Sequence, residues 1–189
     1  MKKTWPALIA LTASTIATAA PAGAQEVGVS NRGISEPEVI AAQQAWCKAL
    51  VDISTTFERS GHQAARGLAE RVIDAAYAYQ MGPVLFKPTL TVAPQTFRPT
   101  RAGALAYFVG GDTAFPNDKG FALSGWKRCE PANNALFIAG NSASTMGHVS
   151  FTDSSGRVTT VDKTWTFVKD DAGKLRIAVH HSSLPYTGR

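Results

Sequence analysis

The spacing of apolar residues changes about halfway along this chain, and this change restricts the possible fold more than any other feature. Between residues 35 and 79, apolar side chains recur every three or four positions, as on one face of a helix. Between residues 121 and 183, short runs rich in β-branched and aromatic residues alternate with turns, as in consecutive strands. Helices that precede the strands, rather than alternate with them, predict an α+β fold with a mainly antiparallel sheet.

The helical half begins with a strong start signal. Ser35 followed by Glu38 three positions later forms a capping box, and an amphipathic stretch then continues to about Arg59. Ser60 and Gly61 should end this first helix. A second helix rich in small apolar residues is expected over 62–79. The small side chains allow that helix to pack closely.

Strand signals dominate the rest of the chain. A β-rich segment at 84–92 contains a proline suited to a sheet edge, and a short helix is expected over 99–108. Five further strands are expected, at 121–129, 135–143, 145–152, 158–169 and 174–183. A turn at 131–134 should separate the first two of them. Long helices lying across such a sheet, if it is strongly curved, would form a half-open cone with an internal pocket.

The N-terminus resembles an export signal. Lys2 and Lys3 precede an apolar run at 5–20, and the small residues at 22–24 predict cleavage before Gln25. The alternative is an N-terminal membrane anchor, but the run is shorter and richer in Thr and Ser than a membrane span of about 20 apolar residues. The prediction is therefore a periplasmic or secreted protein that is not held in a membrane after cleavage.

Processing also changes the charge argument. Residues 1–24 would be the signal peptide, 25–34 a flexible lead-in and 35–189 a single domain. The formal net charge of +5 falls to +3 on the remaining 165 residues, because two lysines leave with the signal. Without a dense Lys/Arg cluster, so small an excess does not indicate a nucleic-acid partner.

Two cysteines, Cys47 and Cys129, remain in the mature chain. In an oxidising compartment they can form one disulfide that closes a long loop. Alternatively they are two separate buried thiols, since Cys47 lies on an apolar helix face. Their spacing does not match a structural zinc site.

The last strand carries an unusual pair of histidines followed by two serines. Strand alternation places His180 and Ser182 on one face and His181 and Ser183 on the other. One such pair should line the pocket, where a neutral imidazole beside a hydroxyl can pass protons near neutral pH. The alternative is a hydrogen-bond network that holds the C-terminus in place.

Two further polar residues are expected near the same cone, and a metal site is a competing hypothesis. Thr89 follows a proline in the expected edge strand, and Tyr107 lies at the end of the expected short helix. A three-histidine metal site would require His62 and His148 to converge with one of the C-terminal histidines, because the latter two face opposite ways.

Several motifs occur in an order that resembles one enzyme family, over about residues 36–186. They are VLFKPT at 84–89, FRPTR at 97–101, YFVGG at 107–111, FPNDKGFA at 115–122 and HHSSLPY at 180–186. This series resembles the bacterial iota-class carbonic anhydrases. That class is built on the association-domain fold of calcium/calmodulin-dependent kinase II, within the NTF2-like (SnoaL-like) superfamily.

The resemblance implies a function and a set of site residues. It implies the NTF2-like cone, an export signal, a homodimer formed through the sheet, and reversible hydration of CO2 to bicarbonate. By motif position, the bicarbonate-sized pocket of the family falls on Thr89, Tyr107, His180 and Ser182. The last two are the pair that strand alternation had already placed on one face.

The resemblance leaves two questions open. Family members are described both as metal-free and as metal-dependent; the shortage of ligands in this sequence favours an enzyme without a metal or other cofactor over a zinc or manganese enzyme. The alternative function is a non-catalytic NTF2-like module that mediates oligomerisation or binds a small ligand.

Overall fold

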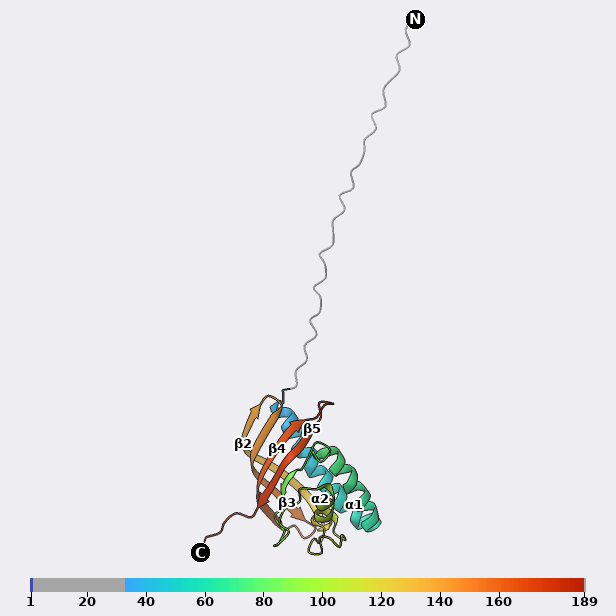
Figure 1. Cartoon of the computed structure of the whole chain (residues 1–189), viewed down its shortest axis with the longest axis vertical. Helices are drawn as coiled ribbons and strands as arrows, with labels where there is room; N and C mark the ends of the chain where they lie inside the picture. Colours follow the sequence, from blue (N-terminus) through green and yellow to red (C-terminus); the bar gives the residue numbers. More distant parts are fainter. Residues whose placement is uncertain (2–32, 189) are drawn as a thin grey trace. The chain divides into compact units, whose positions relative to one another are not determined.

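The computed structural model describes Met1 and residues 33–188 (Figure 1). The expected signal peptide (apart from Met1) and most of the expected lead-in lie outside the described residues. The elements are α1 (Glu36–Ala76), β1 (Leu85–Lys87), α2 (Arg101–Val109), the 3-10 helix η1 (Phe121–Leu123), β2 (Trp126–Ala139), β3 (Ser142–Asp153), β4 (Val158–Lys169) and β5 (Leu175–Ser183). The predicted α+β architecture is confirmed.

The five strands form one mixed sheet in the order β1-β5-β4-β3-β2. Strand β1 is parallel to β5, and the other neighbouring pairs are antiparallel, as the sequence predicted. The helices α1 and α2 lie together beside the sheet (Figure 1). Alternate residues of β3 and β4 are buried on the face toward the helices, which makes that face one wall of the core.

The long helix α1 consists of two helical segments joined at a kink. At its start, the backbone N–H of Ser35 donates to Glu38 Oε2 at 2.8 Å, which confirms the predicted capping box. At the kink, Gly61 has a φ of +78°, a conformation that favours glycine. The second segment ends earlier than expected, because Tyr77 is extended and bridges Ile177 of β5.

The predicted turn at 131–134 is wrong. Strand β2 continues through this segment with a bulge between Asn133 and Ala135, and the turn comes later, at 140–141. Because β2 is at the sheet edge, Pro131 is tolerated there without its N–H. A Cβ on Gly147 of β3 would lie 2.1 Å from the carbonyl oxygen of Ala132, so the close approach of the bulge requires glycine.

Two other expected strands have different bounds from those predicted. The segment 84–92 pairs only over β1, because Pro88 follows directly and has no N–H to donate to the sheet. Residues 121–123 form η1, and β2 starts only at Trp126. The loop after β1 returns to the strand, where the Arg98 N–H donates to the Phe86 carbonyl oxygen at 2.8 Å.

A buried ion pair holds this loop. The guanidinium of Arg98 makes hydrogen bonds of 2.7 to 3.0 Å to both carboxylate oxygens of Asp118, and both side chains are 2% exposed. Arg98 also donates to the carbonyl oxygens of Gln95 and Phe97. The loop that carries Thr89 is thereby tied to the loop between α2 and η1.

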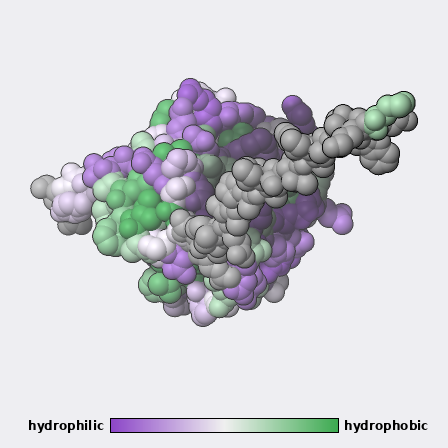
Figure 2. Space-filling view, turned by 90° about the horizontal axis from the view of Figure 1, so that it is seen from above, coloured by the Kyte–Doolittle hydropathy of each residue, from purple (hydrophilic) through white to green (hydrophobic). Residues whose placement is uncertain are grey.

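The surface combines polar and apolar regions. Figure 2 shows hydrophilic residues over most of the viewed face, with hydrophobic patches between them. On the side of the sheet away from the helices, Phe137 is 73% exposed and Met146 is 62% exposed. No helix among residues 33–188 is both long enough and apolar enough to span a bilayer.

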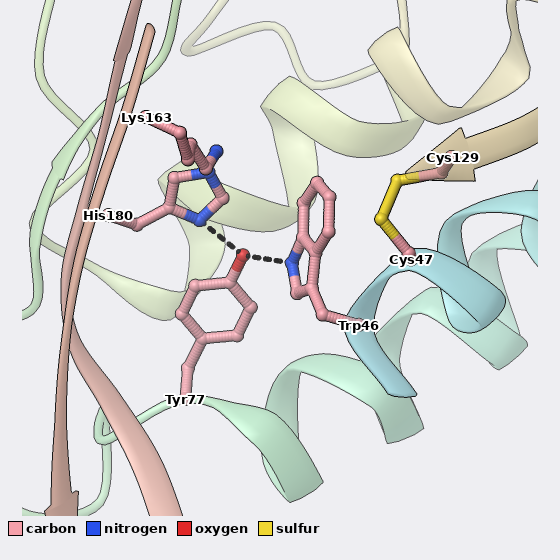
Figure 3. Close-up of a disulfide and its surroundings, with 6 residues drawn as sticks. All are labelled: Trp46, Cys47, Tyr77, Cys129, Lys163 and His180. Carbon is pink, nitrogen blue, oxygen red and sulfur yellow. Dashed lines mark hydrogen bonds between the residues drawn. A yellow bond between two sulfur atoms is a disulfide. The ribbon is translucent and has the colours of Figure 1, made fainter. Parts of the chain in front are cut away.

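A disulfide between Cys47 and Cys129 joins α1 to β2 (Figure 3). The two Cα atoms are 5.1 Å apart and are separated by 82 positions in sequence. Of the two alternatives for the cysteines, the structure contains the disulfide. Cys47 directly follows Trp46, so this cross-link lies beside the aromatic core.

Candidate functional site

A pocket of about 350 Å³ lies between the helices and the inward face of the sheet. Its walls are largely aromatic, with Trp46, Tyr107, Phe108, Phe121, Trp126 and Phe151. Thr89, Tyr107, His180 and Ser182 all line it. The structure therefore brings together the four site residues that the sequence predicted, from β5, α2 and the loop after β1.

The predicted facing of the last strand is confirmed. His180 and Ser182 are 2% and 6% exposed, whereas His181 is exposed on the other face. Facing β5, Trp165 pairs with His180 and Lys163 pairs with Ser182. All four side chains are on the inward side of the sheet and are buried.

Three of the hydroxyl groups that line the pocket belong to the predicted site residues Thr89, Tyr107 and Ser182. Thr89 Oγ1 donates to Ser182 Oγ at 2.8 Å, which links the loop after β1 to β5. Burial raises the pKa of the Tyr107 hydroxyl well above its ordinary value of 10.0, and a hydrogen bond with the backbone of Leu90 opposes this shift. Tyr107 therefore stays protonated at neutral pH and can donate a hydrogen bond.

His180 belongs to a buried chain of hydrogen bonds (Figure 3). Trp46 Nε1 donates to Tyr77 Oη at 2.9 Å, and Tyr77 Oη is 2.8 Å from His180 Nδ1. Burial is the main reason that the pKa of His180 lies well below 6.5, and the nearby Lys163 and His181 lower it further. The imidazole is consequently neutral at neutral pH.

The other ring nitrogen of His180 contacts a lysine. Nε2 lies against the Lys163 Nζ, which also lies 4.9 Å from the ring centroids of both Trp46 and Trp165. Lys163 is 3% exposed and lines the pocket. Burial lowers its pKa well below 10.5, so the amine is favoured in its uncharged form.

Sequence reasoning missed Lys163, Tyr77 and Trp46 as members of the site. A signal for Lys163 was present: it interrupts the inward apolar series of β4, between Val161 and Trp165. A lysine in the middle of a buried strand face is rare unless it has a partner there. For Tyr77 and Trp46 the pattern indicated only core positions, and no local signal distinguishes them.

Charged residues mark the solvent-facing edge of the pocket. Arg157 and Asp153 both line it and form an ion pair of 3.1 Å, in which the Arg157 side chain is 78% exposed. Hydrogen bonds to its carboxylate lower the pKa of Asp153, and the bond from the Ser155 side chain has the largest effect. Asp153 is therefore an ionised carboxylate and a weak proton acceptor.

The remaining histidines do not meet at this pocket. His62 Nε2 lies 2.7 Å from the carbonyl oxygen of Val109, and His148 pairs with Asp162 at 3.3 Å on the outward face of the sheet. The alternative of a three-histidine site is therefore wrong. Among residues 33–188, no group of three His, Cys, Asp or Glu side chains is placed to hold a metal ion.

Comparison with known proteins decides the family. The family model of metal-independent carbonic anhydrases matches residues 37–184. The chain belongs to this family. A metal-independent carbonic anhydrase from Nostoc sp. (strain PCC 7120) is 66% identical over 158 residues, which is 84% of this chain and 77% of the relative.

Solved structures agree with this assignment. The iota-carbonic anhydrase from a cyanobacterium, crystallised with bicarbonate, is 63% identical with a TM-score of 0.85, covering 87% of this chain and 100% of that one. A putative calcium/calmodulin-dependent protein kinase II association domain from Xanthomonas campestris shares the fold at 21% identity, with a TM-score of 0.51 and coverage of 86% and 100%.

The comparisons confirm three sequence predictions: the iota-class carbonic anhydrase family, the fold of a calcium/calmodulin-dependent kinase II association domain, and an enzyme without a metal cofactor.

Proposed function

We propose that this chain catalyses the reversible hydration of CO2 to bicarbonate in the pocket lined by Thr89, Tyr107, His180 and Ser182. The observation that carries the proposal is the arrangement of this pocket: the Thr89, Tyr107 and Ser182 hydroxyls and a buried neutral imidazole lie in a cavity with many aromatic side chains in its walls. The family supplies the reaction, and the bicarbonate complex of the cyanobacterial relative supports the anion.

The chemistry of the pocket suits this reaction. CO2 is small and apolar, and aromatic walls can hold it without competing for hydrogen bonds. The hydroxyls of Thr89 and Ser182 can orient a water molecule for attack on its carbon. Negative charge then develops on the substrate oxygens, where the protonated Tyr107 hydroxyl can stabilise it by donating a hydrogen bond.

Stopped-flow measurement of CO2 hydration with a pH indicator tests the proposal directly. The purified protein should accelerate hydration equally well before and after treatment with a strong chelator, since the family is metal-independent. A rate no faster than buffer, with or without added zinc, would refute the enzyme function. A small ligand retained in the pocket by such an inactive protein would instead identify the non-catalytic binding module.

Replacement of single hydroxyls tests the site, and the chain offers a matched control. Ser182→Ala and Tyr107→Phe should each lower kcat/KM at least about tenfold, because the first removes a hydroxyl that orients the water and the second removes a donor to developing charge. Ser183→Ala removes the neighbouring hydroxyl, which lies on the other face of β5, and should leave the rate unchanged. Equal rates for Ser182→Ala and Ser183→Ala would remove this face of β5 from the mechanism.

The proposal includes export to the periplasm or the medium. It is supported by the Cys47–Cys129 disulfide, because such bonds persist mainly in oxidising compartments. Expression of the full chain in a Gram-negative host, followed by mass analysis of the periplasmic fraction, should give a protein that begins at Gln25. Retention of residues 1–24 on a cytosolic protein would contradict export.

The proposal also includes a homodimer formed through the outward face of the sheet. Phe137 and Met146 are exposed on this face, where the neighbouring side chains are mostly uncharged, including Ser144 and Thr166. Burial of these apolar groups by a second copy would remove them from water. Light scattering should give twice the monomer mass, and Phe137→Asp should give the monomer mass; a monomeric wild type would refute the dimer.

A further inference from the structure

Hydration of CO2 requires a group that takes a proton from the attacking water, and His180 is poorly placed to do this alone. Its Nδ1 is engaged with Tyr77 Oη at 2.8 Å, and its Nε2 is engaged with the Lys163 amine. Both nitrogens therefore have protein partners. A proton from the pocket can reach the imidazole only by displacing one of them or by passing through it.

We propose that the amine of Lys163 is the proton acceptor in CO2 hydration and that His180 positions it. This inference rests on the proposed function. Lys163 lines the pocket and pairs directly with Ser182 on the neighbouring strand, where Ser182 accepts a hydrogen bond from Thr89. Lys163 and Ser182 are therefore neighbours across two paired strands, and both line the pocket that would hold the water.

A proton acceptor must be uncharged before the reaction, and the surroundings of Lys163 provide this. The side chain is 3% exposed, and none of the described carboxylates forms an ion pair with it. Its polar neighbour is a neutral imidazole rather than an anion. Desolvation without a compensating charge favours the free amine, in agreement with the lowered pKa of Lys163.

The same surroundings can tolerate the charge once a proton arrives. The faces of Trp46 and Trp165 lie 4.9 Å from Nζ, and such faces attract an ammonium group. His180 can also accept a hydrogen bond from it at Nε2. The bicarbonate formed alongside supplies a counter-charge for as long as it stays in the pocket.

The hydrogen-bond chain provides a tautomer that frees the lysine lone pair. Trp46 can only donate, so Tyr77 Oη accepts from it. When the imidazole hydrogen is on Nδ1, His180 also donates to Tyr77, and Nε2 accepts an N–H from Lys163. The single lone pair of the uncharged amine is then available to the water.

The proposed step balances. The water oxygen forms a bond to the carbon of CO2 while one C=O π pair moves onto oxygen. The O–H bond breaks, and its proton goes to Lys163 Nζ. The products are bicarbonate and an ammonium group, which passes its proton to buffer at the pocket edge and regenerates the free amine.

Lys163→Met tests this role, because methionine keeps the length and apolar character of the side chain but cannot accept a proton. CO2 hydration should fall at least about a hundredfold, within the range of general base catalysis. Lys163→Arg retains a cation that does not release its proton and should be equally inactive. Lys127→Met, at an exposed ion pair with Glu58, is the matched control and should leave the rate unchanged.

Amine rescue separates a chemical role from a structural one. In Lys163→Ala, which leaves space beside His180, added methylamine should restore hydration in proportion to the concentration of its free base. Near-ultraviolet circular dichroism should show that both the Met and Ala variants are folded. Folded variants that are inactive and are not rescued would make Lys163 a structural residue and overturn the inference.

The inference and the proposed function fail in different ways. If the wild type does not hydrate CO2, the proposed function is refuted. If the wild type is active and Lys163→Met retains activity within a few-fold, the function stands and the role of Lys163 is refuted.

Discussion

Removal of the Cys47–Cys129 disulfide should lower the free energy of unfolding by about 4.5 kcal/mol. The cysteines are 82 positions apart, and a cross-link of that span restricts the unfolded chain by this amount in the loop-entropy relation. Domains of this kind are stable by about 5–15 kcal/mol, so the disulfide contributes a large share of the total. The reduced protein should therefore unfold at a clearly lower denaturant concentration than the oxidised protein.

Urea unfolding of the oxidised and reduced wild type, followed by tryptophan fluorescence, measures the effect. With a slope of about 2 kcal/mol per molar urea, the midpoint should fall by about 2 M on reduction. The Cys47→Ala/Cys129→Ala double variant should unfold near the reduced midpoint in both conditions. Thiol counting on unfolded samples establishes the redox state of each preparation.

A small shift of the urea midpoint would contradict the contribution expected for the disulfide from loop entropy. A midpoint shift below about 0.5 M would correspond to about 1 kcal/mol and would refute it. Such a result would mean that residual contacts between the α1 and β2 segments already keep the two cysteines close together in the unfolded ensemble. The disulfide would then restrict the unfolded chain very little.

Three further predictions concern the folded state away from the disulfide. Burial holds the pKa of Lys163 well below 10.5, so this side chain binds a proton more tightly in the unfolded chain than in the folded one. The stability of the wild type should therefore rise with pH, toward that of Lys163→Met, as the pH of the urea titrations approaches 10.5. Asp118→Asn should lower the free energy of unfolding by about 3–5 kcal/mol in the same assay, because it leaves the Arg98 guanidinium buried without its carboxylate. Replacing both residues by apolar side chains should recover most of this loss. Gly147→Ala should lower the melting temperature by several degrees, because the added Cβ would lie 2.1 Å from a carbonyl oxygen of β2. Gly67→Ala is the control and should not lower it, because the nearest atom to its Cβ is 3.7 Å away.

Local patterns predicted most of the fold. The capping box at Ser35, the break at Gly61 and the short helix that became α2 follow from residues within a few positions of one another. The errors arose where a distant contact outweighed a local preference. Pro131 and the asparagines after it read as a turn, yet pairing along the whole of β3 holds them in an edge strand.

The site was predictable in part for the same reason. Alternation placed His180 and Ser182 on one face, and the resemblance added Thr89 and Tyr107. The partners of His180 were not predictable, because Tyr77 is separated from it by 103 positions and alternation does not say which side chain lies opposite. Lys163 was detectable as an anomaly in β4 but not as a neighbour of the imidazole.

The sequence alone therefore determined the order of the elements, the inward face of the last strand and the enzyme family, since these depend on periodicity and on consecutive motifs. Tertiary structure decided the disulfide, the continuous edge strand and the contact between Lys163 and His180. The physical reason is that a repeat period fixes the direction of a side chain. Its neighbours, its loss of water and hence its charge depend on how distant segments pack.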